Sequence, residues 1–279
     1  AGRLGERAVA APVEAAGAGR AQPSEAAAGE AAAREEAAVP EAVPAPLEDR
    51  RVPVRGVRRT IARRMAQAWD EVPHAAGFLE VDATALEAFR AWIGRARRDA
   101  RVSPLAVVVR ALAEVCRQHP AINAWYDHEA EEIVLKGTCH VGVATATDRG
   151  LLVPVVRDVG SKGLLTVARE MAEVVEAARQ GRAAPEQLTG STITITNVGS
   201  LGLDFGWPIV NFPEVAILGV GAIRERAGVV GGQVVARPSF FVSMTIDHRA
   251  LDGADSARAL LTLREILEDE ERLRALLLD

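Results

Sequence analysis

The sequence predicts an α/β domain, in a layered α+β arrangement, with a mixed β-sheet flanked by helices. Segments with apolar residues at helical spacing alternate with short apolar runs. Several of the late runs follow one another closely enough to pair as hairpins. The composition, 49% hydrophobic and 25% charged among 279 residues, is typical of a globular protein with a sizeable core.

The first 46 residues differ in composition from the rest of the chain. Residues 26–46 are mainly alanine, glutamate and proline, with almost no large side chains. Such a segment buries too little apolar area to offset the entropy lost on ordering, and its prolines favour an extended chain. We therefore predict a flexible linker at residues 1–46 and a folded domain at residues 47–279. The alternative for the linker is a marginal alanine-rich helix at residues 24–38.

Three helices are predicted in the first half of the domain. Residues 57–69 have the pattern of a short amphipathic helix. A second helix begins at Thr84, because the apolar residues that follow recur at helical spacing on one face. A third begins after Ser103, an N-cap followed by proline at the first helical position, and ends before Pro120.

Short apolar runs bounded by glycine, proline or polar residues predict the strands of the second half. Two helices accompany them, one at residues 161–181 that its glycine ends and one at residues 254–267. The predicted strands are residues 133–135, 140–146, 151–156, 192–196, 215–220, 233–236 and 240–246.

Charge and cysteine content exclude several classes of protein. A net charge of −5, from 33 basic and 38 acidic residues, gives no reason to expect a nucleic-acid partner. The chain has neither an apolar run long enough to cross a membrane nor an export signal, so we expect no membrane association and a cytoplasmic location. Cys116 and Cys139 lack metal-ligand spacing, so we expect no metal site.

His248 has the most informative context of the five histidines. The apolar run at residues 240–246 leads directly into Asp-His-Arg-Ala-Leu-Asp-Gly at residues 247–253. Charged groups and a histidine at the end of a buried strand are costly to place there for packing alone. This turn is therefore a candidate site, and the alternative is a surface turn that happens to contain histidine.

Residues 247–253 resemble the His-x-x-x-Asp-Gly signature of coenzyme A-dependent acyltransferases. The Asp-His-Arg form is that of the dihydrolipoyl acyltransferase cores of 2-oxo acid dehydrogenase complexes. Four further blocks resemble this family in the same order, and the resemblance covers about residues 50–279. These blocks are residues 54–65 (VRGVRRTIARRM), 150–158 (GLLVPVVRD), 188–202 (LTGSTITITNVGSLG) and 208–219 (PIVNFPEVAILG).

The resemblance implies a chloramphenicol-acetyltransferase-like fold that forms homotrimers, with each active site in a channel between neighbouring subunits. Coenzyme A, a substrate, enters one end, and the dihydrolipoyl arm of a lipoyl domain enters the other. Neither Lys136 nor Lys162 has the setting of a lipoyl attachment site, so we expect the lipoyl group from a domain outside this chain. The implied partners are a 2-oxo acid decarboxylase and a dihydrolipoamide dehydrogenase, around a core that stops at the trimer or has 24 or 60 subunits.

The resemblance also assigns roles to four residues. His248 matches the catalytic histidine, Thr196 a hydroxyl residue, and Asp252 the aspartate that completes the signature. A free thiol is mostly protonated at neutral pH, and a neutral imidazole can take its proton as attack begins. Thr196 is then expected to donate to the oxyanion. Asp252 is expected to hold the histidine loop through an ion pair, for which Arg58 of the first helix is the candidate partner.

Two stretches depart from the family pattern, and both are expected to border the channel. Residues 203–207 (LDFGW) place Trp207 where a small residue is common, and residues 73–78 (PHAAGF) also differ. We take Trp207, Phe205 and His74 as candidates for lining the acyl or lipoyl channel. For His74, which follows Pro73, a structural role in its loop is the favoured interpretation, and the channel is the alternative.

The acyl group and the catalytic role are left with alternatives. The sequence around residues 197–202 resembles acetyl or branched-chain enzymes, whereas Thr196 is familiar from succinyl transferases. Acetyl is the expected group, with branched-chain and succinyl groups as alternatives. A non-catalytic scaffold subunit and a small-molecule acetyltransferase of the same fold are the competing functions. Residues 276–278, three leucines, are expected to form an apolar contact between trimers, or else to pack on their own subunit.

Overall fold

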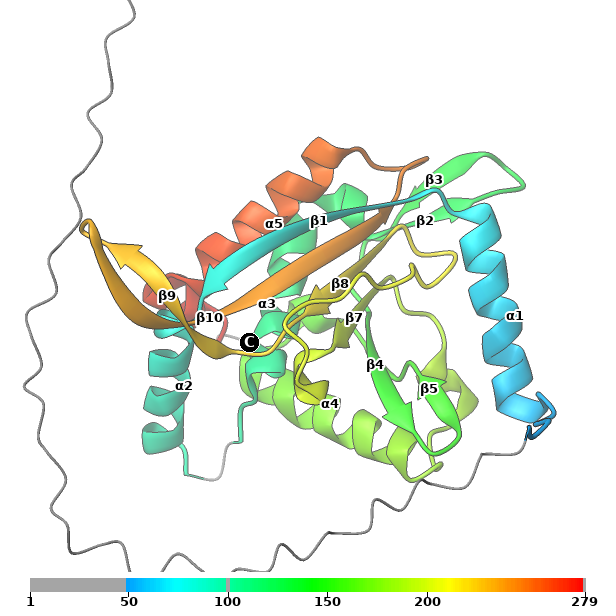
Figure 1. The fold of residues 1–279 in the computed structure, drawn as a ribbon, viewed down its shortest axis with the longest axis horizontal. Helices are drawn as coiled ribbons and strands as arrows, with labels where there is room; N and C mark the ends of the chain where they lie inside the picture. The colour runs from blue at the N-terminus through cyan, green and yellow to red at the C-terminus, as the bar shows by residue number, and fades with distance from the viewer. Residues whose placement is uncertain (1–48, 99–100, 278–279) are drawn as a thin grey trace, which may run out of the picture. The chain divides into compact units, whose positions relative to one another are not determined.

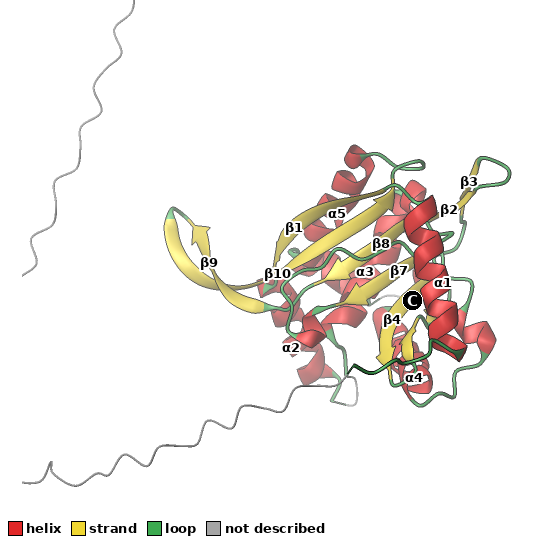
Figure 2. Ribbon diagram, turned by 45° about the vertical axis from the view of Figure 1, so that its right-hand side comes forward, coloured by secondary structure: helices red, strands yellow, loops and turns green. Residues whose placement is uncertain are grey.

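The computed structural model describes residues 49–98 and 101–277, and the predicted linker at residues 1–46 lies outside them. In the described part, the helices are α1 (Gly56–Glu71), α2 (Thr84–Ala96), α3 (Pro104–Gln118), α4 (Leu164–Arg179), α5 (Gly253–Leu267) and α6 (Glu270–Ala275). The strands are β1 (His74–Asp82), β2 (Ala124–Asp127), β3 (Glu132–Leu135), β4 (Val141–Thr147), β5 (Gly150–Leu152), β6 (Val155–Val156), β7 (Ile193–Asn197), β8 (Ala216–Val220), β9 (Arg224–Val230) and β10 (Gln233–Asp247). Helices α3, α4 and α5 cover one face of a large sheet, and α1 lies apart from them beside β5 (Figures 1 and 2).

The large sheet is mixed, as predicted. Its strand order is β1-β10-β8-β7-β4-β5, and β6 and β9 pair with β4 and β10. β7 runs parallel to both β4 and β8, and the other neighbours in the sheet are antiparallel. β2 and β3 form a separate hairpin. The predicted fold class, a mixed sheet flanked by helices, is therefore confirmed.

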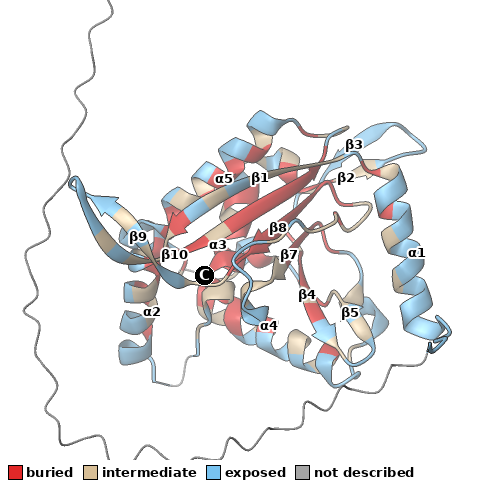
Figure 3. Ribbon diagram, viewed as in Figure 1, coloured by how far each residue is buried: buried red, intermediate tan, exposed pale blue. Residues whose placement is uncertain are grey.

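The core lies between the sheet and helices α3, α4 and α5. Leu112 of α3, Ile195 of β7 and Leu218 of β8 are fully buried in one apolar cluster. Figure 3 shows the buried residues concentrated in α3 and the central strands, whereas α1 is largely exposed. α3 begins where the sequence predicts, because the Ser103 hydroxyl accepts from the Ala106 amide and Pro104 occupies the first helical position.

Several elements differ from the prediction. Residues 74–82, not predicted as a strand, form β1, the edge strand that pairs with β10 along its whole length. The two strands predicted at residues 233–236 and 240–246 are one continuous strand, β10, in which Pro238 lies opposite Glu225 of β9. The strand predicted at residues 151–156 is broken around Pro154 into β5 and β6. β2, β9 and α6 were also not predicted.

The C-terminal leucines pack on their own chain. Leu276 is buried, and its carbonyl accepts from the Leu164 amide at 2.9 Å. Leu277 packs against the same core, and Leu278 lies outside the described residues. The contact between trimers expected at these leucines is therefore wrong for Leu276, whose side chain already fills space in its own subunit.

Among the described residues, no helix has the length and apolar character needed to cross a membrane.

Candidate active site

His248 lies in a tight turn at the carboxyl end of β10. Its amide donates to the Pro73 carbonyl at 3.0 Å, and the Ala250 and Leu251 amides donate to the Asp247 carbonyl. The backbone of the turn is thus fixed from both sides, whereas the imidazole is exposed. A rigid loop that presents an exposed imidazole can hold a proton-transfer group against a second surface.

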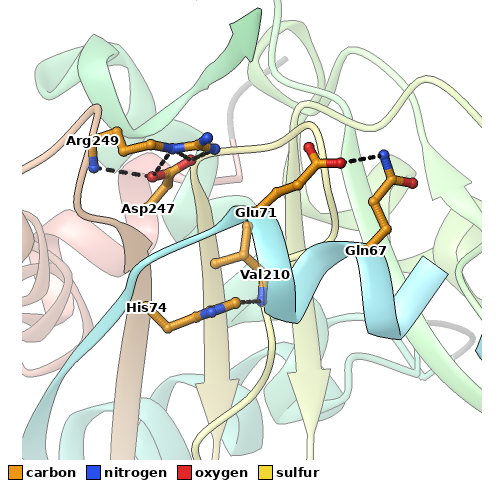
Figure 4. Close-up of polar contacts among 6 residues, drawn as sticks. All are labelled: Gln67, Glu71, His74, Val210, Asp247 and Arg249. Atoms are coloured by element: carbon orange, nitrogen blue, oxygen red, sulfur yellow. Dashed lines mark hydrogen bonds and ion pairs between the residues drawn. The ribbon is translucent and has the colours of Figure 1, made fainter. Parts of the chain in front are cut away.

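The carboxylate beside His248 holds this turn. Asp247 is only 1% exposed, and it accepts from the Arg249 amide at 3.0 Å and from the guanidinium Nη2 at 2.6 Å. The Arg249 side chain folds back over Asp247 (Figure 4) and lies over the Tyr126 ring, 4.1 Å from its centroid. The hydrogen bonds that Arg249 donates to Asp247 raise the pKa of Arg249. Charge-assisted bonds to a buried carboxylate therefore stabilise both residues that flank His248.

Replacing this buried carboxylate is expected to weaken the fold. Asp247→Asn should lower the free energy of unfolding by about 2 kcal/mol, because a half-buried guanidinium loses its counter-charge. Urea unfolding measures the loss. The matched control is Asp204→Asn, an exposed carboxylate that also pairs with arginines and should cost less than about 1 kcal/mol. Equal losses in the two variants would contradict a special role for Asp247.

Asp252 has a different role from the one expected. Its carboxylate caps α5, accepting from the Ala254 and Asp255 amides at 2.8 and 3.0 Å. The ion pairs between described residues of the chain do not include one from Asp252 to Arg58, and both side chains are exposed. The expected Asp252–Arg58 pair is therefore not formed within one chain, because α1 packs beside β5, away from the start of α5 (Figure 1).

Thr196 lies near the carboxyl end of β7 and is half-buried. It lines a cavity of about 750 Å³ at the end of the sheet. The cavity walls come from the start of α3, the end of α4, strand β4 and the loop at residues 197–201. Mostly apolar walls with a few hydroxyl groups are typical of a small-molecule site.

Within one chain, Thr196 and His248 are far apart. Thr196 pairs with Gly219 of β8, which pairs with Ser243 of β10, five residues before His248. The two residues are therefore separated by roughly 16 Å along the strands and roughly 10 Å across two strand spacings. A single thioester cannot touch both of them in one copy of the chain.

Phe205 and Trp207 lie on the exposed loop before β8. Phe205 is 59% exposed, and its ring contacts the rings of Phe78 and Phe241 edge-on. Trp207 is 56% exposed. Neither lines the cavity that contains Thr196. Their assignment to a channel depends on a surface that one chain does not provide, and it stays a prediction.

His74 is held in a structural role. Its Nε2 accepts from the Val210 amide at 3.1 Å (Figure 4), and its ring stacks on Trp69 with centroids 5.7 Å apart. Burial lowers the pKa of His74, which favours the neutral ring that this bond requires. His74 thereby fastens the loop at Val210 to the start of β1, in line with the structural role favoured for it.

Glu214 is a residue that the sequence reasoning missed. It is 1% exposed, and its Oε1 accepts from the Ser191 hydroxyl and from the Asn211 amide group. Burial raises its pKa to about 7. The available signal was a glutamate directly before the apolar run Val215–Val220, where a carboxylate is costly unless it is paired or neutral.

The comparison of the whole sequence with protein families adds to this geometry. Residues 46–275 match the family described as "2-oxoacid dehydrogenases acyltransferase (catalytic domain)". The chain belongs to this family.

Members of the family from two kinds of complex are similar to the chain. The lipoamide acyltransferase component of the branched-chain alpha-keto acid dehydrogenase complex of Pseudomonas aeruginosa is 43% identical over 223 residues, 79% of this chain and 52% of the relative. The dihydrolipoyllysine-residue acetyltransferase component of the pyruvate dehydrogenase complex of Bacillus subtilis is 36% identical, over 83% of this chain and 54% of the relative. The chain thus spans about half the length of the curated relatives it matches.

A solved family member has the same fold. The dihydrolipoamide acetyltransferase of Azotobacter vinelandii aligns with a TM-score of 0.77 and 34% identity, over 83% of this chain and 95% of that one. The study of that enzyme names a serine, a histidine and an asparagine whose role in the catalytic mechanism it investigates. The asparagine follows the histidine by four positions, and the serine precedes it by 52.

Proposed function

We propose that this chain transfers an acyl group between dihydrolipoamide and coenzyme A, with His248 as the proton-transfer residue. The observation that carries the proposal is a shared spacing. Asp252 follows His248 by four positions and Thr196 precedes it by 52, as do the asparagine and serine named for the Azotobacter enzyme. The exposed imidazole on a fixed turn supports the same assignment.

The chemistry follows from the thiol. The attacking thiol loses its proton to the His248 imidazole as its sulfur bonds to the thioester carbonyl carbon. The resulting tetrahedral intermediate carries an oxyanion, to which the Thr196 hydroxyl donates. The intermediate then collapses, its bond to the original sulfur breaks, and the imidazolium returns the proton to the departing thiolate. One base therefore serves both halves of the exchange.

Two copies of the chain are required for this site. Because Thr196 and His248 are too far apart within one copy, we propose that Thr196 of one subunit faces His248 of its neighbour in a homotrimer. A closed ring of three head-to-tail contacts provides three equivalent sites. The exposed side chains of His248, Phe205 and Trp207 are available for such contacts.

We propose a branched-chain acyl group as the preferred substrate, ahead of the acetyl group favoured from the sequence. The support is the higher identity to the branched-chain relative, 43% against 36% for the acetyl relative. Succinyl has no comparable support. The lipoyl group would come from a separate lipoyl domain, with residues 1–46 as a linker.

Turnover of coenzyme A esters on free dihydrolipoamide tests the function and the acyl preference together. We expect isobutyryl-coenzyme A to exceed acetyl-coenzyme A in kcat/KM by roughly tenfold, the discrimination that one or two methyl groups allow. Succinyl-coenzyme A is the third substrate. A faster acetyl reaction would overturn the preference, and absence of turnover with all three esters would overturn the function.

The wider assignments belong to the same proposal. The relatives are components of branched-chain and pyruvate dehydrogenase complexes. We propose that trimers of this chain form the core of such a complex in the cytoplasm, with a 2-oxo acid decarboxylase and a dihydrolipoamide dehydrogenase as partners. Sedimentation of the purified protein separates a trimer from a core of 24 or 60 subunits.

A further inference from the structure

Glu214 is a buried carboxylic acid without a counter-charge. Of the described residues, only Glu214 and Asp247 are buried acids, and Asp247 is paired with Arg249. No ion pair of the described residues includes Glu214. An isolated carboxylate in such a place is costly, so the group needs either donors for its charge or a proton.

The groups that surround Glu214 satisfy only one of its two oxygens. Oε1 accepts from Ser191 and Asn211, the latter at 2.7 Å, whereas Oε2 is buried and has no partner. The Asn211 amide group also lies 3.3 Å from the Thr194 hydroxyl. Ser191 and Thr194 flank the start of β7, and Asn211 belongs to the loop before β8. The carboxyl group therefore joins two segments that meet at the end of the sheet.

The backbone beside Glu214 is connected to both residues that flank His248, directly to Asp247 and through Tyr126 to Arg249. The Val215 carbonyl, next to Glu214, accepts from the Asp247 amide at 2.8 Å. The Pro213 carbonyl, on the other side of Glu214, accepts from the Tyr126 amide at 3.0 Å, and Tyr126 lies under the Arg249 guanidinium. The backbone on one side of Glu214 thus contacts Asp247 directly, and on the other side it is connected to Arg249 through Tyr126.

We propose that Glu214 is a positioning residue for His248, and that it acts as the neutral acid. Its hydrogen bonds join the start of β7 to the loop that precedes β8. The backbone of this loop and of Val215 in turn holds Tyr126 and Asp247 in place. Ionisation would leave a buried charge that only water or a shift of the loop can solvate, and His248 would then move with Asp247. The inference rests on the proposed acyl transfer.

The electrostatic surroundings support this assignment. Burial raises the pKa of Glu214 to about 7, and the hydrogen bonds from Ser191 and Asn211 oppose the rise. The side chains around it are neutral, and they include Trp125 of β2, whose backbone bridges to Glu214. Of the charged residues on nearby elements, Lys136 lies over the Trp125 ring, Asp247 pairs with Arg249, and Arg64 of α1 lines a small pocket with Asn211.

The pH dependence of kcat tests the proposal. In the wild-type protein, kcat should fall roughly fivefold between pH 7 and pH 8 as a single group with a pKa of about 7 ionises. Glu214→Gln keeps an oxygen for Ser191 and Asn211 and cannot ionise, so its kcat should stay level over this range. Ser191→Ala removes a donor that favours the carboxylate, so its fall should move to higher pH.

Glu80→Gln is the matched control, because Glu80 is an exposed glutamate that also accepts from a serine hydroxyl. It should keep the wild-type profile. A fall that persists in Glu214→Gln, or a Glu80→Gln profile that also becomes level, would overturn the proposal. If Glu214→Gln does not fold, the pH profile of kcat in Ser191→Ala tests the proposal instead. A Ser191→Ala profile that is not shifted to higher pH would overturn the proposal.

A second readout does not depend on turnover. The wild-type protein at pH 6 should show an infrared carbonyl band of a buried protonated carboxylic acid that disappears above pH 8 and is missing from Glu214→Gln. If acyl transfer is absent, the proposed function fails whatever this band shows. If transfer is present and the band is missing from the wild type, the neutral Glu214 fails alone.

Discussion

Mixing His248→Ala with Thr196→Ala is expected to restore acyl transfer that each variant lacks alone. Loss of the base should cost His248→Ala roughly 10²–10⁴-fold in kcat, and loss of a donor to the oxyanion should cost Thr196→Ala roughly 10²–10³-fold. In a mixed trimer, a Thr196 from one variant can face a His248 from the other. Random assembly of equal amounts then gives about a quarter of the wild-type sites.

The control for this experiment is a mixture of the two variants assembled separately and combined only at the time of assay. This mixture should remain inactive unless subunits exchange. The recovery in co-assembled trimers would contradict a site within one chain, because no single chain in the mixture carries both side chains. Failure to recover activity in demonstrably mixed trimers would contradict the shared site.

Gly221→Ala is expected to destabilise the protein by at least about 3 kcal/mol. A Cβ at this position would lie 1.7 Å from the Asp204 carbonyl oxygen, so the backbone itself must shift. Gly221, which directly follows β8, also packs closely on the loop at residues 197–201. A Cβ at Gly199 of that loop would lie 2.5 Å from the backbone of Gly221. Because this loop also borders the cavity at Thr196, kcat/KM should fall in whatever protein remains folded. Urea unfolding and steady-state kinetics measure the two effects.

Gly94→Ala is the matched control for the glycine substitution. Gly94 lies inside α2, and a Cβ there would meet no atom within 4 Å. Alanine should therefore stabilise the protein by about 0.5–1 kcal/mol through helix propensity. An equal loss of stability in the two variants would contradict this account, because the crowding at Gly221 would then not explain its loss.

Local signals in the sequence predicted the elements that depend on local chemistry. The serine and proline before α3 act as predicted, and Thr84 begins α2 as predicted. β1 was missed because Ala75, Ala76 and Gly77 have neither alternation nor bulk, and its strand form depends on pairing with β10. The same dependence on a partner strand explains why β10 appeared as two strands rather than one.

The sequence predicted which residues belong to the candidate site better than it predicted which residues contact one another. The turn at His248 was identified from a run of charges after a buried strand, but the carboxylate that holds it is Asp247 and not Asp252. Asp247 is buried at the end of β10, whereas Asp252 is exposed. The sequence pattern does not show which of the two carboxylates is buried. Glu214 was missed for a similar reason, since its environment is built from Ser191, Thr194 and Asn211, which only the fold brings together.

The distance between Thr196 and His248 has a consequence for the activity of subunits that are not yet assembled. If neighbouring subunits share the reaction centre, as we propose, a newly synthesised chain that has not yet met its neighbours would be catalytically silent. Unassembled subunits would then leave thioesters intact, and specific activity should fall steeply on dilution below the dissociation constant of the proposed trimer.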